Sequence, residues 1–342
     1  MVLTVAFALL GVACGTVAGR LMALVFARLR TVCALAASLR SVHELFWALL
    51  LIQVTGLSPF TGILAIAIPY AGIFALVLSK IIEEAGLAAD RVLPTGTDTV
   101  SRFAYARIPV LAGPFGTYLL YRCECGIRST LVLGFIGLPT MGFELETCFR
   151  QGRSAGAAVL VLVLYLLIGT HRLWVRPPTL PFLLAASVLA ITWLTEPIAG
   201  DSIWSNMALF LGTDIVPRPL RQADLGSLAT WVAFASSLWA ILYTQALPGV
   251  VKPLILSQIA LVASGFLALL LFPLVCRRCA GRIGQPPGRV ALVVLRSTPE
   301  YMLAYVLLQT LGPSMQPAAI ALAQHNGGIF GYLLGRHADA LP

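Results

Sequence analysis

Three charged residues lie close together in an otherwise apolar stretch and are the first candidates for chemistry. Arg122, Glu124 and Arg128 fall between apolar segments at 110–120 and 131–136. The apolar flanks indicate that this stretch lies at membrane depth. Charged side chains there are costly, so they usually face the interior of a helix bundle or a water-filled cavity. Glu124 and Arg128 are four residues apart and can pair on one helix face, which leaves the positive charge of Arg122 to attract an anion. We therefore predict that the three residues line a translocation path, with a self-satisfied structural network as the alternative.

The sequence carries no recognisable enzyme motif. It contains neither the Gly-Lys pair of a phosphate-binding loop nor the HExxH pattern of zinc peptidases. Cys276 and Cys279 form one CxxC pair, but a structural zinc site takes four ligands and no second pair lies near. We expect no catalytic residue, no metal site and no cofactor, so any ATP hydrolysis would fall to another subunit.

The composition indicates that these residues are held by membrane-spanning helices. The chain has 342 residues, of which 59% are hydrophobic and 11% charged, whereas soluble domains carry about 25% charged residues. Apolar runs recur with lengths near the ~20 residues that cross a hydrocarbon core of about 30 Å. They cover residues 3–27, 61–82, 155–170, 180–194, 228–247 and 255–275. The fold class expected is an all-α, polytopic transmembrane helical bundle.

The net charge of +9 is better explained by membrane topology than by binding to nucleic acid. Arginine is enriched in cytoplasmic loops, which predicts the cytoplasmic side for Arg20, Arg40, Arg176 and the loop 276–289. Segment 109–135 then crosses outward, and the polar stretch 196–226 is expected to be an external loop. Only an odd number of crossings can connect this external loop to the cytoplasmic loop 276–289, so residues 228–247 and 255–275 cannot both be full spans. We expect residues 228–247 to be an interfacial or partial span.

An internal repeat divides the chain. Residues 39–44 (LRSVHE) return as residues 295–300 (LRSTPE), and at the same offset of 256 residues Gly72 matches Gly328. Both copies have serine followed three residues later by glutamate, the pattern of a capping box at a helix start. The helix-start residues are Arg40, Ser41 and Glu44 in the first copy and Arg296, Ser297 and Glu300 in the second.

The repeat predicts two homologous units. The first covers residues 1–176 and includes a cytoplasmic loop at 83–107. The second covers residues 177–342 and is expected to be truncated before its own loop. Within the first loop Val100, Phe103 and Ala104 have helical spacing, which suits docking of a short helix into a groove of another protein. A simple connector is the alternative.

These motifs resemble the permease subunit of phosphonate- and phosphite-type ABC importers, the type I, binding-protein-dependent class. That family shows an Arg-Ser-x-x-Glu-Leu helix start, found here at 40–45. It also shows a coupling loop with a glycine and, thirteen residues later, a proline; Gly96 and Pro109 match, with Ile108 before the proline and Asp90 near the loop start. The most specific likeness is Tyr-Arg-x-Glu at 121–124, Arg-Ser at 128–129 and Val-Leu-Gly-Phe-x-Gly at 132–137.

The resemblance implies an importer component of the bacterial inner membrane. A periplasmic or lipid-anchored binding protein would deliver phosphonate or a related small oxyanion. An ATPase dimer would grip the coupling loop, and a second permease chain could complete the path. Phosphonate, phosphite and phosphate stay equally open as substrates.

Two other functions fit the sequence. A secondary transporter also uses internal repeats, but it would need no coupling loop and no ATPase. The truncated second unit also fits an inactive fragment of a fused permease.

Overall fold

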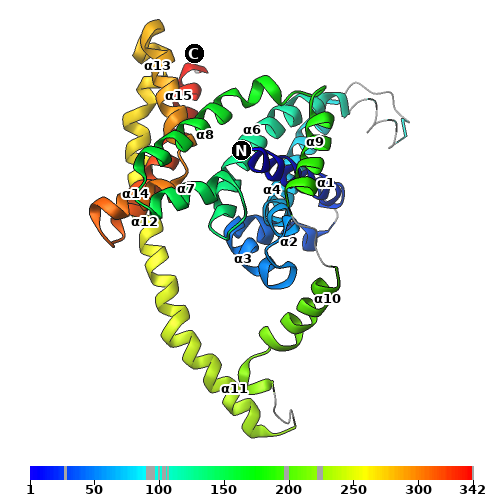
Figure 1. Cartoon of the computed structure of the whole chain (residues 1–342). Coiled ribbons are helices and arrows are strands. Elements are labelled where there is room, and N and C mark those ends of the chain that lie inside the picture. The colour runs from blue at the N-terminus through cyan, green and yellow to red at the C-terminus, as the bar shows by residue number, and fades with distance from the viewer. Residues whose placement is uncertain are drawn as a thin grey trace. The chain divides into compact units, whose positions relative to one another are not determined.

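The computed structural model describes residues 1–26, 29–89, 97–98, 101, 105, 108–195, 200–221 and 226–340. Every regular element among these residues is a helix, which confirms the all-α class (Figure 1). The elements are α1 (Val2–Phe26), α2 (Arg30–Ser41), α3 (Glu44–Thr55), α4 (Pro59–Ala89), α6 (Ile108–Gly134), α7 (Met141–Arg150), α8 (Ser154–Trp174), α9 (Leu180–Leu194), α10 (Gly200–Leu209), η2 (Phe210–Asp214), η3 (Arg218–Leu220), α11 (Leu228–Ile241), η4 (Leu242–Ala246), α12 (Leu247–Val275), α13 (Arg277–Ser297), α14 (Glu300–Leu311) and α15 (Gln316–Ala340).

The helices form two compact units. Unit 1 covers Met1–Ile215 and unit 2 covers Val216–Pro342. This division follows spatial contacts, whereas the boundary between residues 176 and 177 follows the sequence repeat and stays a prediction.

Several helices are long and apolar enough to cross a membrane. Within the described part of the chain four candidates qualify: Val2–Phe26, Pro59–Glu84, Ser154–Trp174 and Leu228–Val275. Two bent pairs qualify if each pair counts as one broken span, α2 with α3 at 95° and α13 with α14 at 82°. Helix α6 carries its charges in mid-helix, yet its 27 residues extend about 40 Å at 1.5 Å per residue and are long enough to cross.

The two apolar runs at 228–247 and 255–275 belong to one continuous helix. A π-helical turn, η4, joins α11 to α12, so Leu228–Val275 extends over 48 residues without reversing. At 1.5 Å per residue this helix is about 70 Å long, more than twice the thickness of the hydrocarbon core. The runs are therefore not two antiparallel spans, and the interfacial or partial position of 228–247 stays a prediction.

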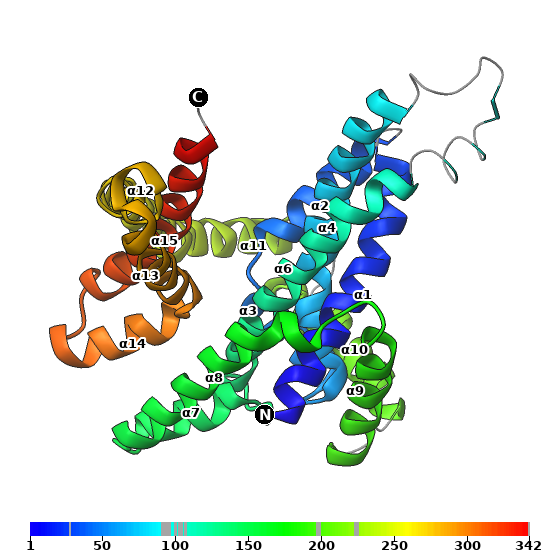
Figure 2. The same ribbon diagram turned by 90° about the horizontal axis from the view of Figure 1, so that it is seen from above.

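The sequence repeat is matched by a repeated packing arrangement. Helix α1 packs along α4 in unit 1, and α12 packs along α15 in unit 2 (Figure 2). Each long pair is joined by a bent pair, with α2 and α3 against α4 and with α13 and α14 against α15. Equivalent residues make equivalent contacts: Gly72 of α4 faces Leu39 and Arg40, and Gly328 of α15 faces Leu295 and Arg296.

Glycines allow the two long helices of each unit to approach closely, but they lie on the first helix of the pair in unit 1 and on the second helix of the pair in unit 2. In unit 1 the glycines are on α1, where Gly11, Gly15 and Gly19 pack on Ile66, Tyr70 and Phe74 of α4. At the repeat offset these glycines correspond to Leu267, Leu271 and Val275 of α12. In unit 2 the glycines are instead on α15, where Gly327, Gly331 and Gly335 pack on those three residues. Small residues at every fourth position are a common basis of close helix packing in membranes. The glycines and the larger residues have exchanged helices between the two units, and the close helix contact is kept in both.

The capping-box prediction is wrong in both copies. Ser41 is the last residue of α2, and its hydroxyl donates to the carbonyl oxygen of Ser38 at 2.8 Å. His43 is the N-cap of α3, and its Nδ1 accepts from the backbone nitrogen of Leu45. Ser297 likewise ends α13, and Pro299 precedes α14. Glu44 and Glu300 are the first residues of α3 and α14, so the repeated motif marks a sharp bend between two helices.

The stretch expected to be an external loop is partly helical. Residues 200–220 contain α10, the π-helical turn η2 and the short 3-10 helix η3. Helix α10 packs against α3 within unit 1. Between residues 200 and 220 this polar, proline-rich stretch therefore contains short helices, and its external position stays a prediction.

Candidate functional site

Helix α6 positions all three candidate path residues. Its second half, from Cys123 to Gly134, is largely buried against α1 and α4 of unit 1. Glu124 is 4% exposed, while Arg122 and Arg128 are half-buried. The charges therefore lie inside the helix bundle of unit 1, where a charged group needs a partner or water.

Aromatic rings surround the guanidinium group of Arg122. The Nε of Arg122 donates a hydrogen bond to the hydroxyl of Tyr118 at 2.7 Å. Its Cζ lies 5.1 Å from the ring centre of Tyr118, 5.4 Å from that of Tyr121 and 5.8 Å from that of Tyr70. Cation–π contacts at these distances orient an arginine without neutralising its charge. Arg122 is thus fixed in place but remains a net positive group.

Arg122 shares a cavity with the end of α2. The cavity is about 370 Å³ in volume and is lined by Ala37, Arg40, Ser41, Ile73, Leu76, Val77 and Arg122. Arg40 and Ser41 come from the last turn of α2, directly before the 95° bend into α3. The described lining therefore contains two guanidinium groups, one hydroxyl and no carboxylate. This is the donor set that binds a tetrahedral oxyanion, because arginine donors match its oxygens in pairs.

Glu124 and Arg128 lie on the same helix, as the spacing requires. Arg128 donates from Nη2 to the sulfur of Cys125 at 3.5 Å, and the following Ser129 shares a hydrogen bond with the hydroxyl of Tyr70 at 3.4 Å. Pairing between Glu124 and Arg128 stays a prediction. The short-range contacts around Arg128 are nevertheless directed into the bundle of unit 1, because Cys125, Ser129 and Tyr70 are all buried.

The glycine-containing motif after Arg128 has a packing role. A Cβ on Gly134 would overlap the backbone of Gly142 and Phe143, and a Cβ on Gly142 would overlap the backbone of Leu131. The end of α6 and the start of α7 thus cross at backbone contact. The backbone nitrogen of Met141 donates to the hydroxyl of Thr4 in α1 at 2.9 Å, which ties this crossing to the α1–α6 packing.

The predicted coupling loop lies mostly outside the described residues. Asp90, Gly96 and Phe103 fall there, so their role stays a prediction. Ile108 and Pro109 are described and are the first two residues of α6. Proline is favoured in the first turn of a helix, where its missing N–H has no intrahelical partner in any case. The loop therefore leads directly into the helix that carries Arg122.

The second copy of the bend differs in its charges. Arg296, the counterpart of Arg40, has its Cζ 5.1 Å from the ring centre of Tyr332, which occupies the position of Leu76. Glu300 Oε2 lies 3.8 Å from Nδ1 of His325. Ser297 is 2% exposed, and its hydroxyl has no hydrogen-bond partner among the described residues. An aromatic ring thus covers the arginine in unit 2, whereas in unit 1 the arginine borders a cavity.

Sequence reasoning did not find the grouping of Arg40 with Arg122 or the contribution of Tyr70 and Tyr118. Arg40 was identified only as a charge flanking a helix start. A signal was nevertheless present, since Tyr118, Tyr121 and Arg122 lie on one helical face at a spacing of three and four residues.

The long apolar helices define a multi-pass helical membrane protein with a charged cavity in unit 1. The chain is 24% identical over 318 residues to the phosphate-import permease protein PhnE of Mycolicibacterium smegmatis, an alignment that covers 88% of this chain and 57% of PhnE. It is 27% identical over 134 residues to the phosphite transport system permease protein PtxC of Stutzerimonas stutzeri, covering 38% of this chain and 48% of PtxC. The putative phosphite permease protein HtxE of the same organism is 25% identical over 131 residues.

These relatives confirm the resemblance to phosphonate- and phosphite-type permeases. The chain spans little more than half the length of PhnE and about half the length of PtxC and HtxE. No family model matches the chain, and no solved structure matches it significantly.

Proposed function

We propose that the chain is a transmembrane component of an ABC importer that moves phosphonate, phosphite or phosphate across the membrane. The observation that carries the proposal is the cavity where Arg122 of α6 meets Arg40 and Ser41 of α2. Two permanently charged guanidinium groups favour an anion, and the tyrosines around Arg122 hold its donors in one orientation. The named relatives import phosphate or transport phosphite, and both are small oxyanions of the kind that this cavity would bind.

The bend between α2 and α3 gives the cavity a mechanical role. Transporters commonly place substrate sites at discontinuous helices, where backbone irregularity borders a cavity rather than lipid. Here the bend directly follows Arg40 and Ser41. A change in the angle between α2 and α3 would move Arg40 relative to Arg122 and so alter the affinity for the anion. We assign Glu124 and Arg128 to the support of this path.

The proposed transport requires partners. We assign ATP hydrolysis to a separate ATPase dimer that docks on the loop 83–107, and ligand delivery to a substrate-binding protein. The entry of this loop into α6 at Ile108 and Pro109 supports a direct mechanical link from the ATPase to Arg122.

The repeat supports two permease units in one chain, 1–176 and 177–342. The aligned shares imply that PhnE is about twice as long as PtxC, as expected if PhnE joins two units and PtxC has one. The paired packing of α1 with α4 and of α12 with α15 supports the presence of two such units.

Reconstitution tests this function against secondary transport. The chain is placed in liposomes with its ATPase and binding protein, and uptake of labelled phosphite is measured with ATP or a non-hydrolysable analogue on the ATPase side. The proposal expects uptake with ATP and no uptake with the analogue. Uptake that is equal with the analogue and that follows an ion gradient would contradict it.

A further inference from the structure

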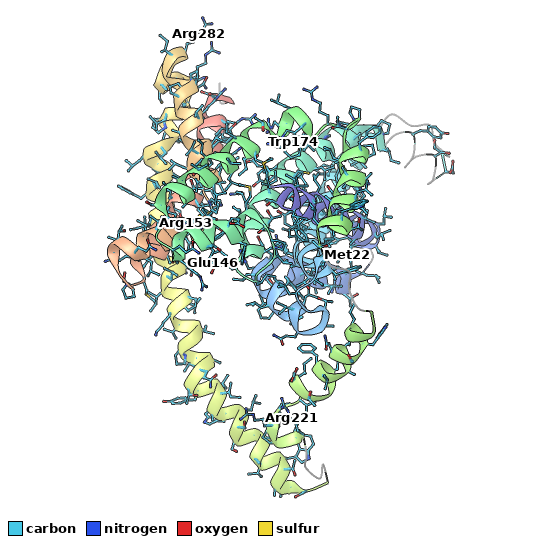
Figure 3. All side chains as sticks on the ribbon, viewed as in Figure 1. Met22, Glu146, Arg153, Trp174, Arg221 and Arg282 are labelled. Atoms are coloured by element: carbon cyan, nitrogen blue, oxygen red, sulfur yellow. The ribbon has the colours of Figure 1, made fainter. Side chains whose placement is uncertain are left out.

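A second cavity in unit 1 has the character of a lipid site. It is about 500 Å³ in volume and lies among α1, α6, the end of α8 and α9. Its lining is almost entirely aliphatic, aromatic or glycine, apart from Thr16, Thr117, Cys123 and two arginines. The two arginines are Arg20 of α1 and Arg176, which follows α8. Trp174, labelled in Figure 3, marks the end of α8 from which Val175 and Arg176 continue.

The charges of this cavity are not balanced locally. Both arginines are exposed, and no acidic side chain is among the described residues that line the cavity. The Cζ of Arg20 lies 4.5 Å from the ring centre of Phe115, a contact that orients the guanidinium group and leaves its charge. The positive-inside pattern predicts the cytoplasmic side for Arg20 and Arg176 independently, and the structure brings both to one cavity.

Two glycines keep the apolar part of the cavity open. Gly113 and Gly116 lie on the α6 wall, and a Cβ built on either one meets no atom within 4 Å. Glycine in a helix interior costs about 0.5–1 kcal/mol relative to alanine. These two glycines therefore carry that cost without any close helix contact to explain it, while the space beside them is free for a ligand.

We propose that this cavity binds one anionic glycerophospholipid, with an acyl chain along the apolar wall and the phosphate at Arg20 and Arg176. Basic pockets between membrane helices on the cytoplasmic side recognise anionic headgroups, and the attached hydrocarbon gains from burial. A free oxyanion shares the phosphate chemistry but would gain nothing from the apolar wall. The site is separate from the cavity at Arg40 and Arg122, so it does not depend on the proposed transport function.

The test measures lipid retained by the 342-residue chain. The protein is purified in detergent, mixed with phosphatidylglycerol or phosphatidylcholine, and examined by native mass spectrometry. The proposal expects one tightly retained phosphatidylglycerol per chain, weaker retention of phosphatidylcholine, and no displacement by millimolar inorganic phosphate. Retention should fall by roughly fivefold for each arginine removed in R20Q and R176Q.

Matched controls separate the site from general effects. The double variant R153Q and R282Q removes the same charge at two exposed arginines outside the cavity, both labelled in Figure 3, and should retain phosphatidylglycerol as the wild type does. Gly116→Leu fills the apolar wall and should abolish retention. Gly169→Leu adds the same side chain at another open position, on α8 outside the cavity, and should not.

Three outcomes would overturn the proposal. Equal retention of both lipids by the wild type would remove the headgroup preference. Wild-type retention in Gly116→Leu would show that the lipid lies elsewhere. Absence of any retained lipid, or displacement by inorganic phosphate, would mean that a protein segment or a free anion fills the cavity.

Discussion

The backbone of Gly72 in α4 lies directly against that of Arg40 in α2. A Cβ on Gly72 would be 2.9 Å from the backbone nitrogen of Arg40 and 2.5 Å from the carbonyl oxygen of Ala36. The equivalent Cβ on Gly328 would be 3.2 Å from the backbone nitrogen of Arg296. The contact that holds an arginine beside a helix bend is therefore tighter in the unit where that arginine borders a cavity.

This difference makes the two glycines a matched pair. Gly72→Ala must push α2 away from α4, because both nearest atoms belong to the backbone and cannot rotate aside. We expect it to destabilise unit 1 by about 1–3 kcal/mol, the usual cost of overpacking. Gly328→Ala should cost less. Thermal unfolding of the purified variants in detergent measures both, and an equal or larger loss in Gly328→Ala would contradict the packing difference.

Glu124 tests the buried network on α6. Glu124 is 4% exposed, and on the predicted pairing with Arg128 its neutralisation leaves a buried positive charge uncompensated at a cost of about 3–5 kcal/mol. We expect Glu124→Gln to lower the yield of folded protein after detergent extraction. Glu144→Gln is the control, because Glu144 is exposed in the first turn of α7, where a surface substitution usually changes the free energy of unfolding by about 0.5 kcal/mol or less. Equal yields for the two variants would show that Glu124 is not a structural charge.

The helical class and the repeat could be predicted from sequence because both depend on local patterns. Apolar runs give the helices, and aligned polar residues such as Arg40 with Arg296 reveal the repeat. The capping box could not be predicted correctly, because serine followed by glutamate is equally compatible with a helix end and a new helix start. In the structure Gly72 of α4 packs on the backbone of Ala36 and Arg40 in α2, a tertiary contact that the local pattern does not contain.

Other features were not evident from the local sequence pattern. Residues 242–253 contain a glycine and two prolines, which is typical of a turn, yet α11 continues into α12 through η4. Arg40 and Arg122 are far apart in sequence, and the packing of α2 and α6 on α4 brings them to one cavity. Arg122, Glu124 and Arg128 were predicted as path residues from sequence, whereas Arg40 was predicted only as a helix-start residue and not as a neighbour of Arg122.

The predicted coupling loop can be tested at Gly96. A proline there restricts the backbone and removes one N–H donor, so Gly96→Pro should abolish co-purification of the ATPase. Membrane insertion should be unchanged. Gly96→Ala is the control at the same position. Wild-type recovery of the ATPase with Gly96→Pro would remove the coupling-loop assignment.

The orientation of the repeat predicts the accessibility of its two bends. Single cysteines at Val42 and Thr298, introduced after replacement of the native cysteines, mark equivalent positions directly after α2 and α13. A parallel repeat places both on the cytoplasmic side, so a membrane-impermeant maleimide should label them only in inverted vesicles. Labelling of the two positions from opposite sides would indicate an inverted repeat and would remove a main support of the importer assignment.

The most direct test of the account is oxyanion uptake by cells that carry Arg122 variants. Arg122→Gln removes the charge that the tyrosines orient toward the cavity, so uptake of phosphonate, phosphite or phosphate should fall at least tenfold while folded yield is kept. Arg122→Lys restores the charge and should recover part of the uptake, Arg40→Gln should reduce it, and the exposed control Arg153→Gln should have no effect. Normal uptake by Arg122→Gln would contradict the claim that Arg122 contacts the transported anion.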